Sequence, residues 1–222
     1  MLLALDTSTR SIGLALYDGV QVLSESIWAC RDYHTVELAP EVTRALGKSG
    51  YAAADLTALG VAIGPGSFTG LRIGLAFAKG VALAQRLPLV GVATLDILAA
   101  GQPPQEVPLA AVLQAGRGRL AVGWYRAHHG DWQPQGAAQI LTAEELHDRI
   151  NSPTLVCGEL SEAEQRLLSR KRRNVILASP ARSVRRPAVL AEIAWKRWQA
   201  GQSDPPETLA PIYLHLHEAI PE

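Results

Sequence analysis

The sequence predicts an α/β protein made of two similar layered halves. Short apolar runs of strand character alternate with segments of helical spacing, which is typical of this class. One of these runs ends in a glycine-rich turn that leads directly into a helical segment, and a proline-rich stretch at 101–108 interrupts the periodicity. With 222 residues the chain is long enough to bury a sizeable core. We therefore expect a first lobe over 1–101 and a smaller second lobe over 102–222.

The first half begins with strands. The run at 2–8 is apolar and ends in turn-forming residues, and 11–27 alternates well enough to predict a hairpin that turns at Asp18-Gly19. Apolar residues then recur at helical spacing over 34–47, where the internal Pro40 predicts a late start or a bend. The elements expected after this helix are a buried strand over 57–66, a helix over 70–86 that Pro88 stops, and a strand over 87–94.

Beyond the predicted linker, strands are expected at 108–114 and 120–127, joined by the loop AGRGR. Two helix starts have the form of a capping box, Thr142-x-x-Glu145 and Ser161-x-x-Glu164. The remaining expected elements are a strand at 154–158 and a last helix that opens with Pro187 and closes at Gly201.

Charge and composition exclude several classes of protein. Basic and acidic residues balance at 21 each, so no net field draws the chain to nucleic acid or to a membrane surface. Cys30 and Cys157 lie far apart, without metal-binding spacing or a disulfide framework, which favours a reducing compartment. The N-terminus lacks the pattern of a signal peptide, and no apolar run reaches membrane-spanning length. We expect a cytoplasmic protein.

The stretch GPGSFTGLRIG at 64–74 is the strongest candidate site. Its glycines permit positive φ angles and close backbone approach, and the helix start that follows would favour an anion. The stretch matches neither the lysine-bearing phosphate loop nor GxGxxG, so a strand-to-helix turn that needs glycine only for its geometry stays open. The residues taken as a loop that faces a partner or a nucleotide are Gly64, Pro65, Gly66, Ser67, Phe68, Thr69, Gly70 and Arg72.

This stretch, together with LALDTSTRSIGLALYDG, His34-Thr35 and LPLVGVATLD, resembles the TsaB/YeaZ family. The resemblance is densest over 1–100 and returns at Pro211–Leu214. It implies a two-lobed actin-like fold, that of the acetate and sugar kinase, heat-shock ATPase and actin superfamily, with a reduced second lobe. It also implies an accessory subunit in the synthesis of threonylcarbamoyladenosine, the modified base beside the tRNA anticodon.

The resemblance implies no catalytic residue and no metal in this chain. Relatives in the superfamily place a glycine after the aspartate of their first phosphate hairpin, whereas Thr7 follows Asp6 here. The paralogous catalytic subunit binds a metal with two histidines four residues apart, whereas Leu38 stands four residues after His34. His34 is therefore more typical of a helix cap, and Asp6 of a turn.

The helix over 70–86 is apolar in nearly every direction, more than one core-facing side requires. Ala76, Gly80 and Ala84 recur four residues apart and would let another helix approach closely. A central helix buried within its own lobe is the alternative. The resemblance implies a bundle between the first-lobe helices and the catalytic paralogue, TsaD.

Other candidates are weaker. His215 and His217 could share one face of a strand, but two histidines alone are not a metal site. Trp195 and Trp198 are three apart and fit a core. The loop Gln114–Arg119 replaces an acidic-alanine-arginine stretch of the family, and its role is open. A basic cluster could meet RNA phosphates or form an ordinary solvated face; its members are Arg170, Lys171, Arg172, Arg173, Arg182, Arg185 and Arg186.

The sequence thus predicts a non-catalytic partner subunit that activates TsaD for transfer of threonylcarbamoyl to tRNA. TsaE is a further expected partner, tRNA is expected to meet this chain only through the complex, and the isolated chain could pair with itself. The chain is expected to need no cofactor of its own, with ATP or ADP as a candidate ligand at the interface with TsaD. Two alternatives stay open: an autonomous small-molecule kinase of the same superfamily, and a metallopeptidase-like relative.

Overall fold

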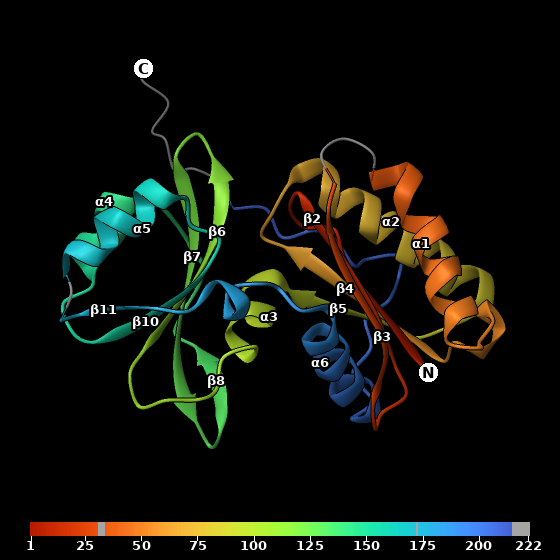
Figure 1. The fold of residues 1–222 in the computed structure, drawn as a ribbon. Coiled ribbons are helices and arrows are strands. Elements are labelled where there is room, and N and C mark those ends of the chain that lie inside the picture. The colour runs from red at the N-terminus through yellow and green to blue at the C-terminus, as the bar shows by residue number, and fades with distance from the viewer. Residues whose placement is uncertain (31–33, 172, 215–222) are drawn as a thin grey trace. The chain divides into compact units, whose positions relative to one another are not determined.

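The computed structural model describes residues 1–30, 34–171 and 173–214, and of His34 only the backbone. The chain forms two α/β units (Figure 1). The first contains Met1–Ile97 and, after a return of the chain, Arg185–Ile212. The second contains Leu98–Val184, and the chain enters it again at Tyr213.

The first unit is built on a five-stranded mixed sheet with the order β3-β2-β1-β4-β5. The three strands of its meander are antiparallel, whereas β1, β4 and β5 run parallel. The strands are β1 (Leu2–Asp6), β2 (Ser11–Tyr17), β3 (Val22–Ala29), β4 (Ala58–Gly64) and β5 (Leu89–Ala93). β1 is buried along its whole length, which explains why it is apolar without alternation.

Helices cover both faces of this sheet. On one face lie α1 (His34–Lys48) and α2 (Phe68–Gln85), which pack Leu38 and Leu75 among others against the sheet. On the other face lies α6 (Pro187–Gln199), whose Leu190 and Ala194 join a second apolar cluster. The short helices η1 (Ala53–Asp55) and α3 (Thr94–Ala100) connect these elements.

The second unit repeats the same strand order in its own sheet, β11-β10-β6-β7-β8, with β9 paired to β7. Its strands are β6 (Leu109–Gly116), β7 (Arg119–His128), β8 (Asp131–Pro134), β9 (Gln139–Leu141), β10 (Thr154–Gly158) and β11 (Val175–Leu177). Its helical segments are α4 (Ala143–Arg149), α5 (Glu162–Leu168), η2 (Ser169–Lys171) and η3 (Pro180–Arg182). Thr142 and Ser161 cap α4 and α5 with the predicted capping boxes.

The structure corrects parts of the sequence analysis. We assigned 102–222 to the second lobe, but the contacts divide the chain at Ile97 and return Arg185–Ile212 to the first unit. This return places α6 on β1, β2 and β4, because the first sheet presents a second apolar face that α1 and α2 do not cover. Pro40 does not delay α1, which already begins at His34. The sequence analysis missed α3 and the short strands β8, β9 and β11.

Among the described residues, no helix is both long and apolar enough to cross a membrane.

Candidate functional site

The glycine stretch joins β4 to α2, as the sequence predicts. Gly64 ends the strand with φ 110°, and Ser67 caps the helix by accepting a hydrogen bond from the Gly70 amide over 3.2 Å. The Gly64 amide donates to the buried Thr94 hydroxyl over 3.1 Å. The loop is thus fixed at both of its ends by its own unit.

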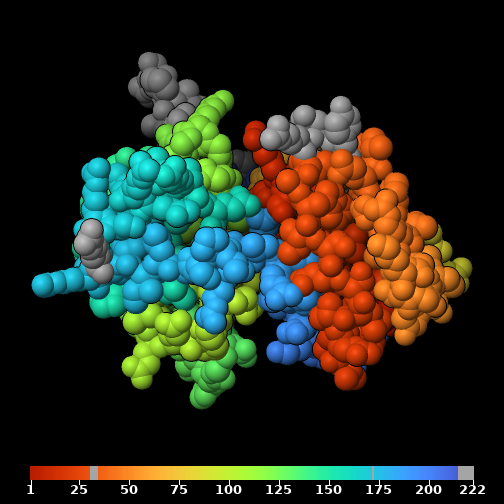
Figure 2. Space-filling model, viewed as in Figure 1, coloured from red at the N-terminus to blue at the C-terminus, as the bar shows by residue number. Residues whose placement is uncertain are grey.

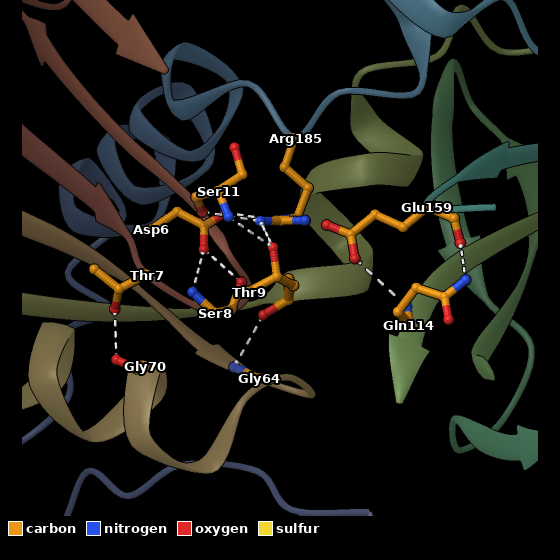
Figure 3. A network of polar contacts seen from close by, with 11 residues as sticks. Asp6, Thr7, Ser8, Thr9, Ser11, Gly64, Gly70, Gln114, Glu159 and Arg185 are labelled. Carbon is orange, nitrogen blue, oxygen red and sulfur yellow. Dashed lines mark hydrogen bonds and ion pairs between the residues drawn. The ribbon is translucent and has the colours of Figure 1, made fainter. Parts of the chain in front are cut away.

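The turn of the β1–β2 hairpin lies directly against this loop and the first turns of α2 (Figure 3). The Ser67 amide donates to the Ser8 carbonyl over 2.6 Å, and the Thr7 hydroxyl donates to the Gly70 carbonyl over 2.7 Å. A Cβ added at Gly66 would lie 2.2 Å from the Ser8 carbonyl oxygen, and one added at Gly70 2.2 Å from the Thr7 carbonyl oxygen. The glycines therefore make room for protein backbone.

Gly74 extends this pattern by one turn of α2. A Cβ there would lie 2.1 Å from the Thr7 hydroxyl oxygen. Our sequence analysis did not single out Gly74. Its position, four residues after Gly70 and eight after Gly66, is the signal that could have identified a helix face pressed against another segment.

The carboxylate of Asp6 is held by a buried ion pair. Arg185 Nε lies 2.8 Å from Asp6 Oδ2, and the two side chains are 4% and 2% exposed. The same guanidinium donates to the Thr9 hydroxyl over 2.6 Å and to the Ser11 carbonyl over 3.3 Å. The other carboxylate oxygen accepts bonds from the Ser8 amide, at 2.8 Å, and from the Ser8 hydroxyl. Asp6 is thus saturated by partners from its own unit.

These contacts bear on the chemistry available at the loop. A nucleotide phosphate or a hydrated metal ion would need open amides, or an aspartate oxygen that faces a free volume. Among the described residues no buried side-chain nitrogen or oxygen lacks a hydrogen-bond partner, and no cluster of three or more histidine, cysteine or acidic residues could hold a metal. Within the first unit, the residues around Asp6 do not fit a bound phosphate.

The outer face of α2 is different in character. Only one face of α2 is buried, so this helix is not enclosed on all sides by its own lobe. The buried face consists of Gly70, Leu71, Gly74, Leu75, Ala78 and Ala82. Ala76, Gly80 and Ala84 are exposed, and a Cβ at Gly80 would meet no atom within 4 Å. The predicted row of small residues is a surface stripe of α2.

Next to this stripe, α1 and α2 enclose a groove of about 460 Å³. Its lining residues are Thr35, Leu38, Phe68, Thr69, Arg72, Ile73, Ala76 and Phe77. Phe68 is 55% exposed although it is a large apolar residue, and the Arg72 guanidinium lies 3.7 Å from its ring centroid. Phe68, Thr69 and Arg72 therefore face this groove. Gly66, Ser67 and Gly70 belong to the packing with the hairpin.

The remaining candidates lie elsewhere. Trp195 and Trp198 are half-buried and meet edge to face with ring centroids 4.9 Å apart, against the second face of the first sheet. In the second unit, Gln114 donates to the Glu159 carbonyl over 3.2 Å (Figure 3). It also donates to the Glu164 carboxylate over 2.7 Å, which ties β6 to the start of α5. His215 and His217 lie outside the described residues.

The predicted basic cluster is split by the fold. Arg185 is buried on Asp6, and Arg186 pairs with Glu25, both within the first unit. Arg170, Arg173 and Arg182 are exposed in the second unit. Arg172 lies outside the described residues. Arg185 is a residue whose role the sequence analysis missed, because no local pattern marks a pair formed with Asp6 across 179 positions of the chain.

Comparison with known sequences supports a common family. Residues 24–168 match the model of the family described as "TsaD: tRNA N6-adenosine threonylcarbamoyltransferase". The tRNA threonylcarbamoyladenosine biosynthesis protein TsaB of Escherichia coli is 34% identical over 152 residues, which are 67% of this chain and 65% of that relative. The protein of the same name from Bacillus subtilis is 29% identical over 226 residues, covering 98% of this chain and 95% of that relative.

Solved structures agree. A Pseudomonas aeruginosa protein described as similar to the peptidase YeaZ superposes with a TM-score of 0.79 at 25% identity, covering 96% of this chain and 99% of that chain. YeaZ of the same organism gives a TM-score of 0.75 at 25% identity, covering 95% and 99%. The ethanolamine utilization protein EutJ of Carboxydothermus hydrogenoformans, at 15% identity and a TM-score of 0.55 over 86% and 88% of the two chains, shares the fold alone. The actin-like α/β fold is thereby confirmed.

Proposed function

Because this chain belongs to the TsaB/YeaZ family, we propose that it is a non-catalytic partner subunit in the synthesis of threonylcarbamoyladenosine on tRNA. Its role would be to bind the threonylcarbamoyltransferase TsaD and to hold it in an active conformation in the cytoplasm. TsaE would be a further partner. A homodimer through the same surface would be the state of the isolated chain.

The observation that carries this proposal is the exposed stripe of α2 beside the α1–α2 groove. Small residues at Ala76, Gly80 and Ala84 leave the helix backbone open to close approach, since nothing lies within 4 Å of a Cβ at Gly80. Phe68, Val36 and Leu83 are 55%, 65% and 59% exposed on the same two helices. Large apolar side chains exposed on two neighbouring helices, beside a row of small residues, are typical of a protein interface with helices of a partner.

The hairpin packing supports the non-catalytic part of the proposal. The glycines that could have approached a phosphate accommodate the Thr7 and Ser8 carbonyls, and Arg185 neutralises Asp6. ATP or ADP would then bind between this chain and TsaD, with the start of α2 at the rim of that site. The same contacts argue against the kinase alternative, because Asp6 and the loop glycines already contact other parts of this lobe.

The decisive experiment is Gly80→Leu, measured for binding to TsaD and for stability of the free chain. The added side chain enters open space in the free protein, so thermal unfolding should stay near that of the wild type or rise slightly, as glycine is unfavourable inside a helix. At an interface the same atoms overpack, which typically costs about 1–3 kcal/mol and corresponds to roughly 5- to 150-fold weaker association. Isothermal titration or native mass spectrometry of the mixture measures this.

Lys79→Ala, one position along the helix, is the matched control and should change association little. Normal binding of TsaD by Gly80→Leu would contradict the proposed interface. Turnover of ATP by the isolated chain, lost on Asp6→Asn, would contradict the non-catalytic role.

A further inference from the structure

We propose that the second unit carries an RNA-phosphate contact formed by Arg170, Lys171 and Arg173, here called the basic edge. This inference rests on the proposed function, since the RNA in question is the tRNA on which the complex would act. It assigns this chain a direct contact with the substrate in addition to its contact with a partner subunit.

The topology brings these residues together at one edge of the second sheet. α4 ends at Arg149 shortly before β10, and α5 followed by η2 ends at Lys171 shortly before β11. β10 and β11 run parallel, so the segments that lead into them lie side by side. The Thr154 amide donates to the Asn174 carbonyl over 2.8 Å, which joins these two segments directly.

Lys171 fixes the geometry of this edge. Its ammonium donates to the Ile150 carbonyl over 3.1 Å and lies 3.5 Å from the Asp148 carbonyl, at the end of α4. The Lys171 carbonyl accepts a bond from the Asn174 amide over 2.9 Å. The backbone of the basic edge is therefore held by bonds within its own unit. In Figure 2 the segment from α5 to β11, coloured cyan, lies on the visible surface.

The charges of Arg170 and Arg173 are uncompensated. Both side chains are exposed, and among the described residues neither has a hydrogen-bond or ion-pair partner. The nearby Arg166 pairs with Glu162, and the acidic side chain at the end of α4, Asp148, is 80% exposed with its oxygen 3.0 Å from His147 Nδ1. The basic edge thus keeps an excess of positive charge on a chain whose net charge is zero.

Helix electrostatics account for only part of this pattern. Arg149 and Arg166 lie in the last turns of their helices, where a cation stabilises the helix dipole. Arg170 lies in the last turn of η2, which directly follows α5, whereas Arg173 comes after both helices have ended. Two uncompensated guanidinium groups a few residues apart suit phosphate oxygens, which they can contact through paired N–H groups, and RNA supplies such phosphates in series.

The test uses the complex with TsaD and an unmodified tRNA transcript. The double variant Arg170→Ala/Arg173→Ala should form the complex with unchanged affinity, yet bind tRNA at least about tenfold more weakly at 0.1 M salt. Each phosphate contact contributes roughly 0.7–0.9 to the slope of log K against log salt. Loss of two contacts should therefore make this slope shallower by about 1.4–1.8. The control, Arg126→Ala/Lys196→Ala, removes two exposed cations elsewhere and should leave both quantities unchanged.

The outcomes are distinguishable. If the wild-type chain forms no complex with TsaD, the proposed function itself fails. If the complex forms and binds tRNA but Arg170→Ala/Arg173→Ala leaves affinity and salt slope unchanged, the basic edge is not an RNA contact and this inference is overturned. A variant that loses TsaD while keeping the wild-type salt slope for tRNA would show a protein-docking edge, which also overturns it.

Discussion

The two units share one strand order but differ in what they place at equivalent positions. In the first, the hairpin turn after β1 is buried, pinned by Arg185 and pressed against α2. In the second, the equivalent turn between β6 and β7 has Gly116 and Gly118 at φ 77° and 69°, with nothing within 4 Å of a Cβ at either. Around the first turn, glycines of the facing loop and helix make room for the carbonyl groups of the turn. In the second turn, the glycines belong to the turn itself and adopt its positive φ angles.

The covering helices differ as well. α1 and α2 have 15 and 18 residues and present apolar and small side chains outward, whereas α4 and α5 have seven residues each and charged outer faces. A sheet needs only one apolar helix face to cover it, so the extra length and the outward apolar surface of α1 and α2 fit the proposed contact with a partner. The same topology thus presents apolar and small side chains outward in one unit and charged side chains in the other.

The largest effect is expected from breaking the buried pair of the first unit. Asp6→Ala leaves the Arg185 charge without its carboxylate at a buried site, and should lower the free energy of unfolding by about 3–5 kcal/mol. Arg186→Ala removes the exposed partner of Glu25 and should cost less than about 1 kcal/mol. Urea unfolding followed by circular dichroism measures both. Equal costs for the two variants would mean that the buried turn is not what distinguishes the first unit.

A medium effect should separate the two uses of glycine. Gly66→Ala places a Cβ against the Ser8 carbonyl and should lower the free energy of unfolding by about 1–3 kcal/mol. Gly66→Asn should be destabilised at least as much, because it brings the same Cβ. Gly116→Ala meets no atoms and costs roughly 1–2 kcal/mol through its positive φ alone, so Gly116→Asn should recover part of the loss. Melting temperatures of the four variants test this. If asparagine recovers stability relative to alanine at position 66 as it does at position 116, the close approach of the Ser8 carbonyl is not the reason for glycine at position 66.

The smallest effect concerns Cys157 in β10, the second-unit equivalent of β4. Burial raises the pKa of its thiol from the ordinary value of 9.0 to about 12. Above pH 9 the unfolded chain releases this proton while the folded chain keeps it, so stability should fall as pH rises from 9 toward 12. By pH 10 the loss is about 1 kcal/mol. Urea midpoints at pH 8 and 10 should therefore differ less in Cys157→Ala than in the wild type. An identical pH dependence in the two proteins would contradict it.

Local signals identified most of the elements. The capping boxes at Thr142 and Ser161, the proline that opens α6 and the glycine stretch before α2 each depend on residues close together in the chain, and each is found where it was predicted. The short strands β8 and β11 were missed, because three or four residues are too few to establish a period. The small-residue row on α2 was also evident, but not whether it faced inward or outward.

The sequence by itself determined the class of fold, the family and the residues that form the glycine stretch, because these are written in local composition and spacing. Only the tertiary structure decided that Arg185 neutralises Asp6, that α6 returns to the first sheet, and that Gly66, Gly70 and Gly74 accommodate a hairpin turn. It also decided that Ala76, Gly80 and Ala84 face outward. The physical reason is that these features depend on contacts between segments far apart in the chain, whose pairing follows from how both faces of one sheet become covered.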